Sequence, residues 1–225
     1  MANFFYYVRR KNKIFPHTTK LTLKKSISCK SVLGMLEFDI PDFVYYPQED
    51  SLLLAEVIEK ISKNFKGKKI LEIGCGSGFI SVLLAKLTGD MITATDINPK
   101  AVENTVYNAK INHVKIKAKQ SNLFNKINKR FDIIIFNPPY IPVKDKNINK
   151  ELRQQWSVFD GNENIIRKFI MESKKYLARN GKIILLFSSL NRDIPEILKA
   201  NGFNIKILGK QKIDWEELFV IEGRL

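Results

Sequence analysis

Cysteine and histidine are scarce in this chain. Its 225 residues include two cysteines, Cys29 and Cys75, and two histidines, His17 and His113. A secreted disulfide scaffold of this length would carry more cysteines. A structural zinc site would need all four residues, and their spacing matches no usual ligand pattern. The sequence therefore disfavours a disulfide scaffold and a zinc enzyme, and we expect no metal site.

Long apolar runs are also missing. The longest are short, such as residues 133–136, whereas a helix that crosses a bilayer needs about 20 apolar residues. The N-terminus lacks the apolar stretch of a secretory signal. Hydrophobic residues make up 44% of the chain and charged residues 27%, which is typical of a protein that folds around a core. We therefore expect a soluble, cytoplasmic protein with no membrane contact.

Acidic residues are absent from the first 36 positions, although the whole chain has 23 of them against 38 lysines and arginines. We therefore expect a basic N-terminal extension, residues 1–36, followed by one domain, residues 37–225. The basic residues of the extension are Arg9, Arg10, Lys11, Lys13, Lys20, Lys24, Lys25 and Lys30. Such an arm can contact RNA phosphates or an acidic protein surface. It also has the composition of an organellar transit peptide, or of a solvated lysine-rich surface.

Helical and strand patterns alternate from residue 49 onward. Asp50 or Ser51 is expected to cap the first helix. Helices are predicted at residues 52–61, 79–87, 165–177 and 194–200, with another beginning at residue 100. Strands are predicted at residues 69–73, 91–95, 114–118, 131–136, 182–187, 203–208 and 218–222. Successive β-α-β units build a parallel sheet between two layers of helices, and the last two strands pair antiparallel because no helix separates them. The predicted fold class is α/β, a three-layer sandwich.

A glycine-rich loop follows the first predicted strand of this sheet. Gly74, Gly76 and Gly78 lie at the carboxyl end of the strand, where α/β sheets bind ligands, and glycine lets the backbone approach a ligand closely. The spacing differs from the G-x-G-x-x-G of dinucleotide-binding loops. Asp96 ends the next strand, 18 residues after Gly78, where a carboxylate can accept both hydroxyls of a ribose. Together these features predict a nucleoside cofactor.

The glycine loop and Asp96 resemble motif I and the ribose-binding acid of the class I S-adenosylmethionine-dependent methyltransferases, with Glu72 opening the loop. This resemblance implies S-adenosyl-L-methionine as the cofactor. It also implies a Rossmann-like, mostly parallel seven-stranded sheet whose last strand is antiparallel. Cys75, inside the loop, is interpreted as a small filler rather than a nucleophile, because no histidine near it in the sequence would activate it.

Asn137, Pro138, Pro139 and Tyr140 follow directly on the fourth predicted strand, and we expect them to be the catalytic residues. The prolines remove two backbone donors but keep both carbonyl acceptors, and Pro138 forces Asn137 into an extended conformation. Asn137 Oδ1 and the Pro138 carbonyl can then accept the two hydrogens of a planar amine or amide. Tyr140 can stack on that flat group and favour the sulfonium charge. Methyl transfer in such a site depends mostly on positioning.

This tetrapeptide resembles the N-P-P-[YF] signature of methyltransferases that act on adenine, guanine or glutamine nitrogens. Residues 44–51, V-Y-Y-P-Q-E-D-S, are similar to the entrance of the archaeal and eukaryotic HemK-type branch, and the resemblance covers roughly residues 43–190. It implies a protein-glutamine N-methyltransferase that modifies the Gly-Gly-Gln motif of class I release factors in translation termination. Members of this branch often need a small zinc-binding activator subunit, which pairs along a sheet edge. The cofactor-binding residues implied are Ser51, Glu72, Gly74, Cys75, Gly76, Gly78, Asp96, Ile97, Asn122 and Leu123.

Asn122 departs from the family pattern, which usually has aspartate in S-D-L-F. An amide oxygen still accepts from the adenine amino group, but without a charge, so weaker cofactor binding is expected. The tetrapeptide and the net charge of +15 also fit an RNA or DNA base amino-group methyltransferase. A DNA enzyme would usually carry a target-recognition domain, for which this chain has little room. A non-enzymatic RNA-binding module with an inactive methyltransferase fold is a third interpretation, disfavoured by the other site residues.

Overall fold

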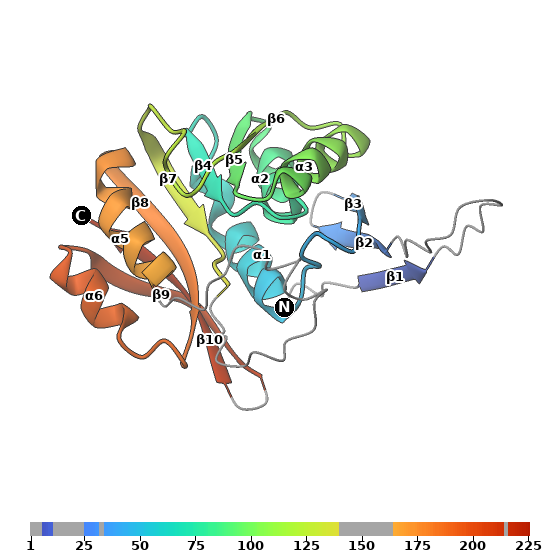
Figure 1. Ribbon diagram of the computed structural model, residues 1–225. Coiled ribbons are helices and arrows are strands. Elements are labelled where there is room, and N and C mark those ends of the chain that lie inside the picture. Colours follow the sequence, from blue (N-terminus) through green and yellow to red (C-terminus); the bar gives the residue numbers. More distant parts are fainter. Residues whose placement is uncertain (1–5, 11–24, 32–33, 140–163, 214–215) are drawn as a thin grey trace.

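The computed structural model describes residues 6–10, 25–31, 34–139, 164–213 and 216–225 (Figure 1). Within those ranges the strands form two sheets. The smaller sheet has the order β1-β2-β3, and both pairings in it are antiparallel. Its strands are β1 (Tyr6–Arg10), β2 (Lys25–Ser31) and β3 (Gly34–Ile40). The boundary expected at residue 36 thus falls inside β3.

The larger sheet has the order β6-β5-β4-β7-β8-β10-β9 in the described part of the chain. Its strands are β4 (Ile70–Ile73), β5 (Ile92–Asp96), β6 (Ile116–Gln120), β7 (Phe131–Phe136), β8 (Leu177–Ser188), β9 (Asn204–Ile213) and β10 (Glu216–Arg224). The pairings from β6 to β8 are parallel, whereas β10 runs antiparallel to both β8 and β9. This topology confirms the predicted α/β class and the antiparallel last strand.

Helices cover both faces of the larger sheet, as Figure 1 shows. They are α1 (Glu49–Ile61), α2 (Phe79–Thr88), α3 (Pro99–Ile111), α5 (Asn164–Tyr176) and α6 (Ile194–Ala200), and a 3-10 turn, η1 (Ser62–Asn64), follows α1. The N-cap of α1 is Gln48, so the prediction that Asp50 or Ser51 caps this helix is wrong. Both residues lie inside the first turn, and their side chains make contacts elsewhere. No helix in the described ranges has the length and apolar character that a membrane crossing requires.

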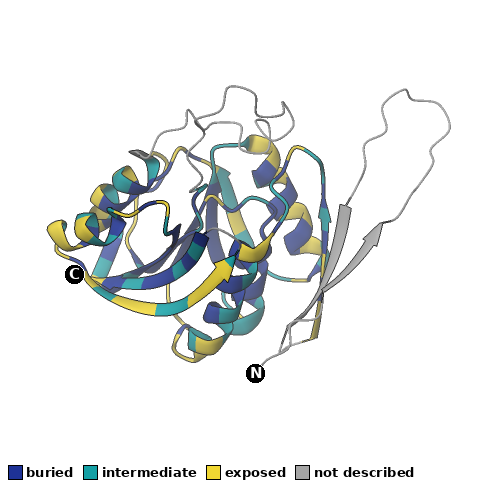
Figure 2. Cartoon of the chain, turned by 90° about the horizontal axis from the view of Figure 1, so that it is seen from below, coloured by how far each residue is buried: buried dark blue, intermediate teal, exposed yellow. Residues whose placement is uncertain are grey.

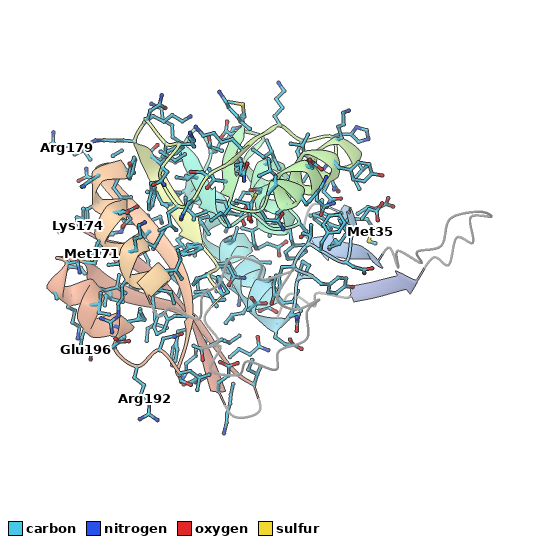
Figure 3. The ribbon with its side chains drawn as sticks, in the orientation of Figure 1. Met35, Met171, Lys174, Arg179, Arg192 and Glu196 are labelled. Atoms are coloured by element: carbon cyan, nitrogen blue, oxygen red, sulfur yellow. The ribbon has the colours of Figure 1, made fainter. Side chains whose placement is uncertain are left out.

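Two buried apolar clusters lie on opposite faces of the larger sheet. One packs α1 and α2 against the sheet and includes Leu36 and Phe38 of β3. The other packs α5 and α6, and in it the rings of Phe136 and Phe169 have centroids 4.8 Å apart. Figure 2 shows these buried residues along the sheet and on the inward faces of the helices. Figure 3 shows Met171 and Lys174 of α5 pointing outward. The sheet therefore has a continuous core on each side.

A ladder of asparagine side chains on α3 and at its C-cap, Asn112, holds β3 in place. Asn104, Asn108 and Asn112 recur every four residues and therefore share one face of the helix. The Asn112 amide accepts from the backbone N–H of Glu37 at 3.0 Å and donates to its carbonyl at 2.6 Å. Asn108 accepts from the N–H of Asp39 at 3.0 Å, and Asn104 donates to the Asp39 carbonyl at 2.7 Å. Side-chain amides thus take the place of a neighbouring strand along this edge of β3.

Candidate active site

A cavity of about 240 Å³ lies where β4, β5 and β7 end. The loops that follow these strands line it, together with the start of α1. The sequence-predicted residues that line it are Ser51, Glu72, Gly74, Cys75, Gly76, Asp96, Ile97, Asn122, Leu123, Asn137, Pro138 and Pro139. Gly78 is outside the lining, and Tyr140 lies outside the residues that the structure describes. Residues from five separate parts of the sequence therefore meet around one hollow.

Glycine is required at both ends of the loop after β4. Gly74 has φ +66°, and a Cβ added there would lie 3.2 Å from Cε2 of Phe136. Gly78 has φ +81°, and a Cβ there would lie 3.0 Å from the Cα of Thr105 in α3. A larger residue would meet both an unfavourable backbone conformation and a close contact. These glycines let the loop pack tightly against β7 and α3 while its backbone faces the cavity.

Cys75 lies between these glycines and is buried. The hydroxyl of Thr105 lies 3.2 Å from its sulfur. Burial raises the pKa of the Cys75 thiol well above its usual value, and the nearby carboxyls of Asp96 and Glu72 raise it further. A thiol that stays protonated is a poor nucleophile, which agrees with the interpretation of Cys75 as a filler.

Asp96 is held by backbone donors on both of its carboxylate oxygens. Oδ2 accepts from the N–H of Gly76 at 2.9 Å, and Oδ1 accepts from the N–H of Asn98 at 2.9 Å. Burial raises the pKa of Asp96, and these backbone donors act in the opposite direction. The backbone N–H of Ile97 also lowers the pKa of this carboxyl. A carboxylate has about four acceptor positions, so these three donors leave room for a ligand hydroxyl. The carboxylate is therefore fixed in position and able to accept from a ligand.

Glu72 is a second carboxyl in the cavity wall, and its residue is 3% exposed. The Ser81 hydroxyl of α2 donates to its Oε2. Burial raises the pKa of Glu72 to about 8, the Ser81 hydrogen bond lowers it, and the charge of Asp96 raises it. A buried carboxyl of this kind is favoured in its charged form when a cation binds beside it. The two acids make this end of the cavity suitable for a cationic ligand that carries a diol.

The loop after β6 closes the cavity beside Asp96. The N–H of Ser121 donates to the Asp96 carbonyl at 2.8 Å, and the Ser121 hydroxyl donates to the carbonyl of Leu123 at 2.9 Å. Leu123 is buried and has φ +44°, an uncommon conformation for a residue other than glycine. Asn122 is exposed between them and lines the cavity. Its amide is therefore free to meet a ligand from the rim.

Asn137 forms the opposite wall. Its Nδ2 donates to Asp50 Oδ2 at 2.9 Å and lies 3.3 Å from the hydroxyl of Ser51. Its Oδ1 is buried and has no hydrogen-bond partner among the residues that the structure describes. Pro138 and Pro139 follow it in the cavity wall and have no N–H to offer. The wall therefore presents hydrogen-bond acceptors, one of which lacks a donor.

Sequence reasoning missed two residues at this wall. The sequence gives Tyr45 and Asp50 no role at the site beyond membership of the entrance motif and, for Asp50, a possible helix cap. In the structure both line the cavity, and the Tyr45 hydroxyl donates to Asp50 Oδ1 at 3.0 Å. The signal available in the sequence was an acid that directly precedes the predicted cofactor residue Ser51.

The sequence matches the family described as Methyltransferase small domain over residues 49–212. The chain belongs to this family. Solved structures of the same fold hold S-adenosylmethionine or S-adenosylhomocysteine. The acids of the cavity fit a cofactor with a positive sulfur, an ammonium group and a ribose diol, which agrees with the predicted S-adenosylmethionine.

Individual relatives agree with the family assignment. A Methanocaldococcus jannaschii protein with the provisional name protein N5-glutamine methyltransferase MJ0928 is 40% identical over 186 residues, covering 80% of this chain and 91% of that protein. The release factor glutamine methyltransferase of Flavobacterium psychrophilum is 30% identical over 215 residues, covering 86% and 74%. These relatives confirm the predicted resemblance to HemK-type enzymes.

A solved structure agrees in fold. The E. cuniculi Mtq2-Trm112 complex, described as responsible for methylation of the eRF1 termination factor, has a chain that superposes with a TM-score of 0.60 at 24% identity. The match covers 81% of this chain and 98% of that one. It confirms that the present chain has the class I methyltransferase fold.

Proposed function

We propose that this chain transfers a methyl group from S-adenosylmethionine to the side-chain amide nitrogen of the glutamine in the Gly-Gly-Gln motif of a class I translation release factor. The names of its relatives support this substrate. The single observation that carries the proposal is the Oδ1 of Asn137, which has no hydrogen-bond partner among the described residues. The prolines beside it in the cavity wall offer no N–H donor. A buried acceptor without a donor costs roughly 1–3 kcal/mol, and a bound amide NH2 would remove that cost.

The two acids support the proposal that one end of the cavity binds the cofactor. Asp96 would accept from the ribose hydroxyls, because its backbone donors fix the carboxylate without filling all of its acceptor positions. Glu72 would face the ammonium group of the cofactor, since a nearby cation lowers the pKa of a buried carboxyl. Gly74, Gly76, Cys75 and Gly78 would shape the loop, while Ser51, Ile97, Asn122 and Leu123 would contact the cofactor from the walls and rim.

Asn137 and Pro138 assign the other end to the acceptor. Asn137 Oδ1 and the Pro138 carbonyl would each accept one hydrogen of the glutamine NH2. This pairing holds the amide plane in one orientation, so that the nitrogen faces the methyl group. The stacking of Tyr140 on the amide remains a prediction. The bound cofactor supplies a methyl group made electrophilic by its positive sulfur. Transfer would replace the S–C bond of the cofactor with a new N–C bond, and the amide nitrogen held by Asn137 and Pro138 would release one proton to solvent.

We also propose a small partner subunit for this enzyme. The E. cuniculi Mtq2 structure was determined with Trm112. The resemblance to the HemK-type branch implies a small zinc-binding activator subunit. RNA contact through the basic residues 1–36 is a further proposal, motivated by their charge. Because release factors act on ribosomes, the proposed substrate corresponds to a cytoplasmic reaction, or to an organellar one if residues 1–36 are a transit peptide.

Transfer of tritiated methyl groups tests the proposed function. The chain, with and without a candidate partner subunit, is incubated with labelled cofactor and a class I release factor. We expect label in the factor and none in a variant whose Gly-Gly-Gln glutamine is replaced by alanine. Label in ribosomal or transfer RNA, with an unlabelled release factor, would instead support a base amino-group methyltransferase and overturn the proposal.

A further inference from the structure

The carboxylate of Asp50 is buried against the acceptor wall. Asp50 is 4% exposed, in the first turn of α1. Its Oδ1 accepts from the hydroxyl of Tyr45 at 3.0 Å and from that of Ser51 at 3.3 Å. Its Oδ2 accepts from Asn137 Nδ2 at 2.9 Å, across 87 positions of sequence. Every one of these contacts brings a donor to the carboxylate.

This contact determines which way the Asn137 amide faces. The oxygen and the NH2 group of asparagine have nearly the same shape, so packing alone distinguishes poorly between the two orientations. An ionised carboxylate only accepts hydrogen bonds, so the group of Asn137 that faces it must be the NH2. The oxygen of Asn137 is then on the opposite side, where it is buried without a partner in the described structure.

The orientation has consequences for the acceptor. With Oδ1 available, the wall receives a side chain that carries an NH2 group. With the amide reversed, an NH2 would oppose the hydrogens of a glutamine and would instead suit a carboxylate. The identity of the residue at position 50 thereby affects which of two isosteric acceptors, glutamine or glutamate, binds the wall.

We propose that Asp50 is a positioning and specificity-determining residue, which holds the Asn137 amide with its oxygen toward the acceptor and so selects an amide over a carboxylate. This inference rests on the proposed function for the identity of the acceptor. It does not rest on that function for the orientation of Asn137, which can be measured separately.

A purely structural role for Asp50 is the competing explanation. Acids in the first turn of a helix stabilise it through the helix dipole, and both Glu49 and Asp50 lie in that turn of α1. Glu49 is exposed, so Glu49→Gln removes a first-turn charge without touching the acceptor wall. Glu49→Gln is therefore the matched control. The test variants are Asp50→Ala and the near-isosteric Asp50→Asn, which keeps the packing but removes the acceptor-only group.

The first measurement follows the side-chain amide of Asn137 by NMR in 15N-labelled protein, with its signals assigned by their loss in Asn137→Ala. We expect its NH2 protons to exchange with solvent about tenfold faster in Asp50→Ala than in the wild type or Glu49→Gln, because a buried hydrogen bond has been lost. Equal exchange in the wild type and Asp50→Ala would overturn the proposal, whatever the substrate is.

The second measurement compares acceptors. The substrate is the release factor with its acceptor glutamine. The inhibitor is the same factor with that glutamine replaced by glutamate, called here the glutamate factor. We expect Asp50→Asn to lower kcat by up to about 100-fold, because the glutamine nitrogen is no longer held facing the methyl group. For each enzyme we divide the inhibition constant of the glutamate factor by the KM for the glutamine factor. We expect this ratio to be about tenfold lower in Asp50→Asn than in the wild type. Glu49→Gln should match the wild type in both respects.

The outcomes separate the two proposals. If Asp50 has a purely structural role, Asp50→Asn should have a lower unfolding midpoint than the wild type. The ratio between the inhibition constant of the glutamate factor and the KM for the glutamine factor should then be unchanged. That result would overturn the inference. If the wild type fails to methylate the release factor at all, the proposed function is wrong. The exchange of the Asn137 NH2 protons then decides alone whether Asp50 holds the amide.

Discussion

The two ends of the cavity are built in different ways. At the end formed by the loops after β4 and β5, Asp96 has a backbone donor on each oxygen and Glu72 has the Ser81 hydroxyl. At the end formed by α1 and the loop after β7, the Oδ1 of Asn137 is buried without a partner in the described structure. The first end holds its groups in place before any ligand binds. The second lacks a hydrogen-bond donor that the acceptor would bring.

This difference indicates that the two ends of the cavity have separate roles, one in cofactor binding and the other in acceptor binding. Under the proposed function, the preformed carboxylates would fix a cofactor that is exchanged at every turnover, and they would depend little on the acceptor. The unsatisfied oxygen instead links acceptor binding to the removal of an energetic cost. Changes at one end should therefore affect cofactor affinity, whereas changes at the other should affect turnover. The following predictions test that separation, from the largest expected effect to the smallest.

Asn137→Ala should have the largest effect. Loss of the amide removes an acceptor for the substrate nitrogen, so we expect kcat to fall about 100-fold or more. Affinity for S-adenosylhomocysteine, measured by calorimetry, should stay within about twofold of the wild type, because the cofactor end is unchanged. Equal losses of turnover and of cofactor affinity would break the proposed separation.

Asp96→Ala should affect the other end. Removing a carboxylate that accepts two hydroxyls should weaken cofactor binding by about 1.5–3 kcal/mol, or about 10- to 150-fold. Calorimetry with S-adenosylhomocysteine measures this loss, and kcat at saturating cofactor should change much less. An unchanged affinity would show that Asp96 does not hold the ribose.

Cofactor binding should release a proton from Glu72. In the free protein burial raises the pKa of this carboxyl to about 8, so near neutral pH it is mostly protonated. A bound cation lowers that pKa, and affinity should therefore rise with pH by up to about tenfold per unit until about pH 8, where it levels off. Calorimetry in buffers with different ionisation enthalpies counts the protons. In Glu72→Gln the release should vanish, and a persistent release would assign it to another group.

Asn108→Ala and Asn112→Ala should distinguish effects on the stability of the fold from effects on cofactor binding. Each loses hydrogen bonds to β3, so each should lower the free energy of unfolding by about 1–3 kcal/mol. Asn108 also donates to the Ser77 carbonyl in the glycine loop at 2.8 Å. Only Asn108→Ala should therefore weaken cofactor binding, by roughly threefold. Denaturant unfolding and calorimetry measure the two effects, and identical cofactor affinities in both variants would contradict the link.

Most of the larger sheet could be predicted from local sequence patterns. The apolar run at residues 131–136 and the alternation with amphipathic helices gave the strands and their parallel arrangement, because both patterns are local. Most of the other strands differ from the predicted limits by one or two residues, and two differ by more. β8 begins at Leu177 rather than 182, and β9 ends at Ile213 rather than 208. Strand ends carry weaker signals than strand centres, since their apolar periodicity fades into the loops.

The smaller sheet and part of the site could not be predicted in this way. The edge of β3 is satisfied by Asn108 and Asn112, which lie 69 and 75 positions away along the chain. Asp50 and Asn137 are 87 positions apart. Such contacts depend on tertiary packing, and no periodicity within either segment records them. The glycine loop and Asn137 were found because their backbone requirements restrict the local sequence itself.

The most direct test of the central claim is a crystal structure of the enzyme with S-adenosylhomocysteine and a release-factor peptide that contains Gly-Gly-Gln. The account predicts that the glutamine NH2 donates to Asn137 Oδ1 and to the Pro138 carbonyl, with Asn137 Nδ2 still on Asp50. A glutamine amide bound elsewhere, or an Asn137 oxygen that remains unpaired in the complex, would contradict it.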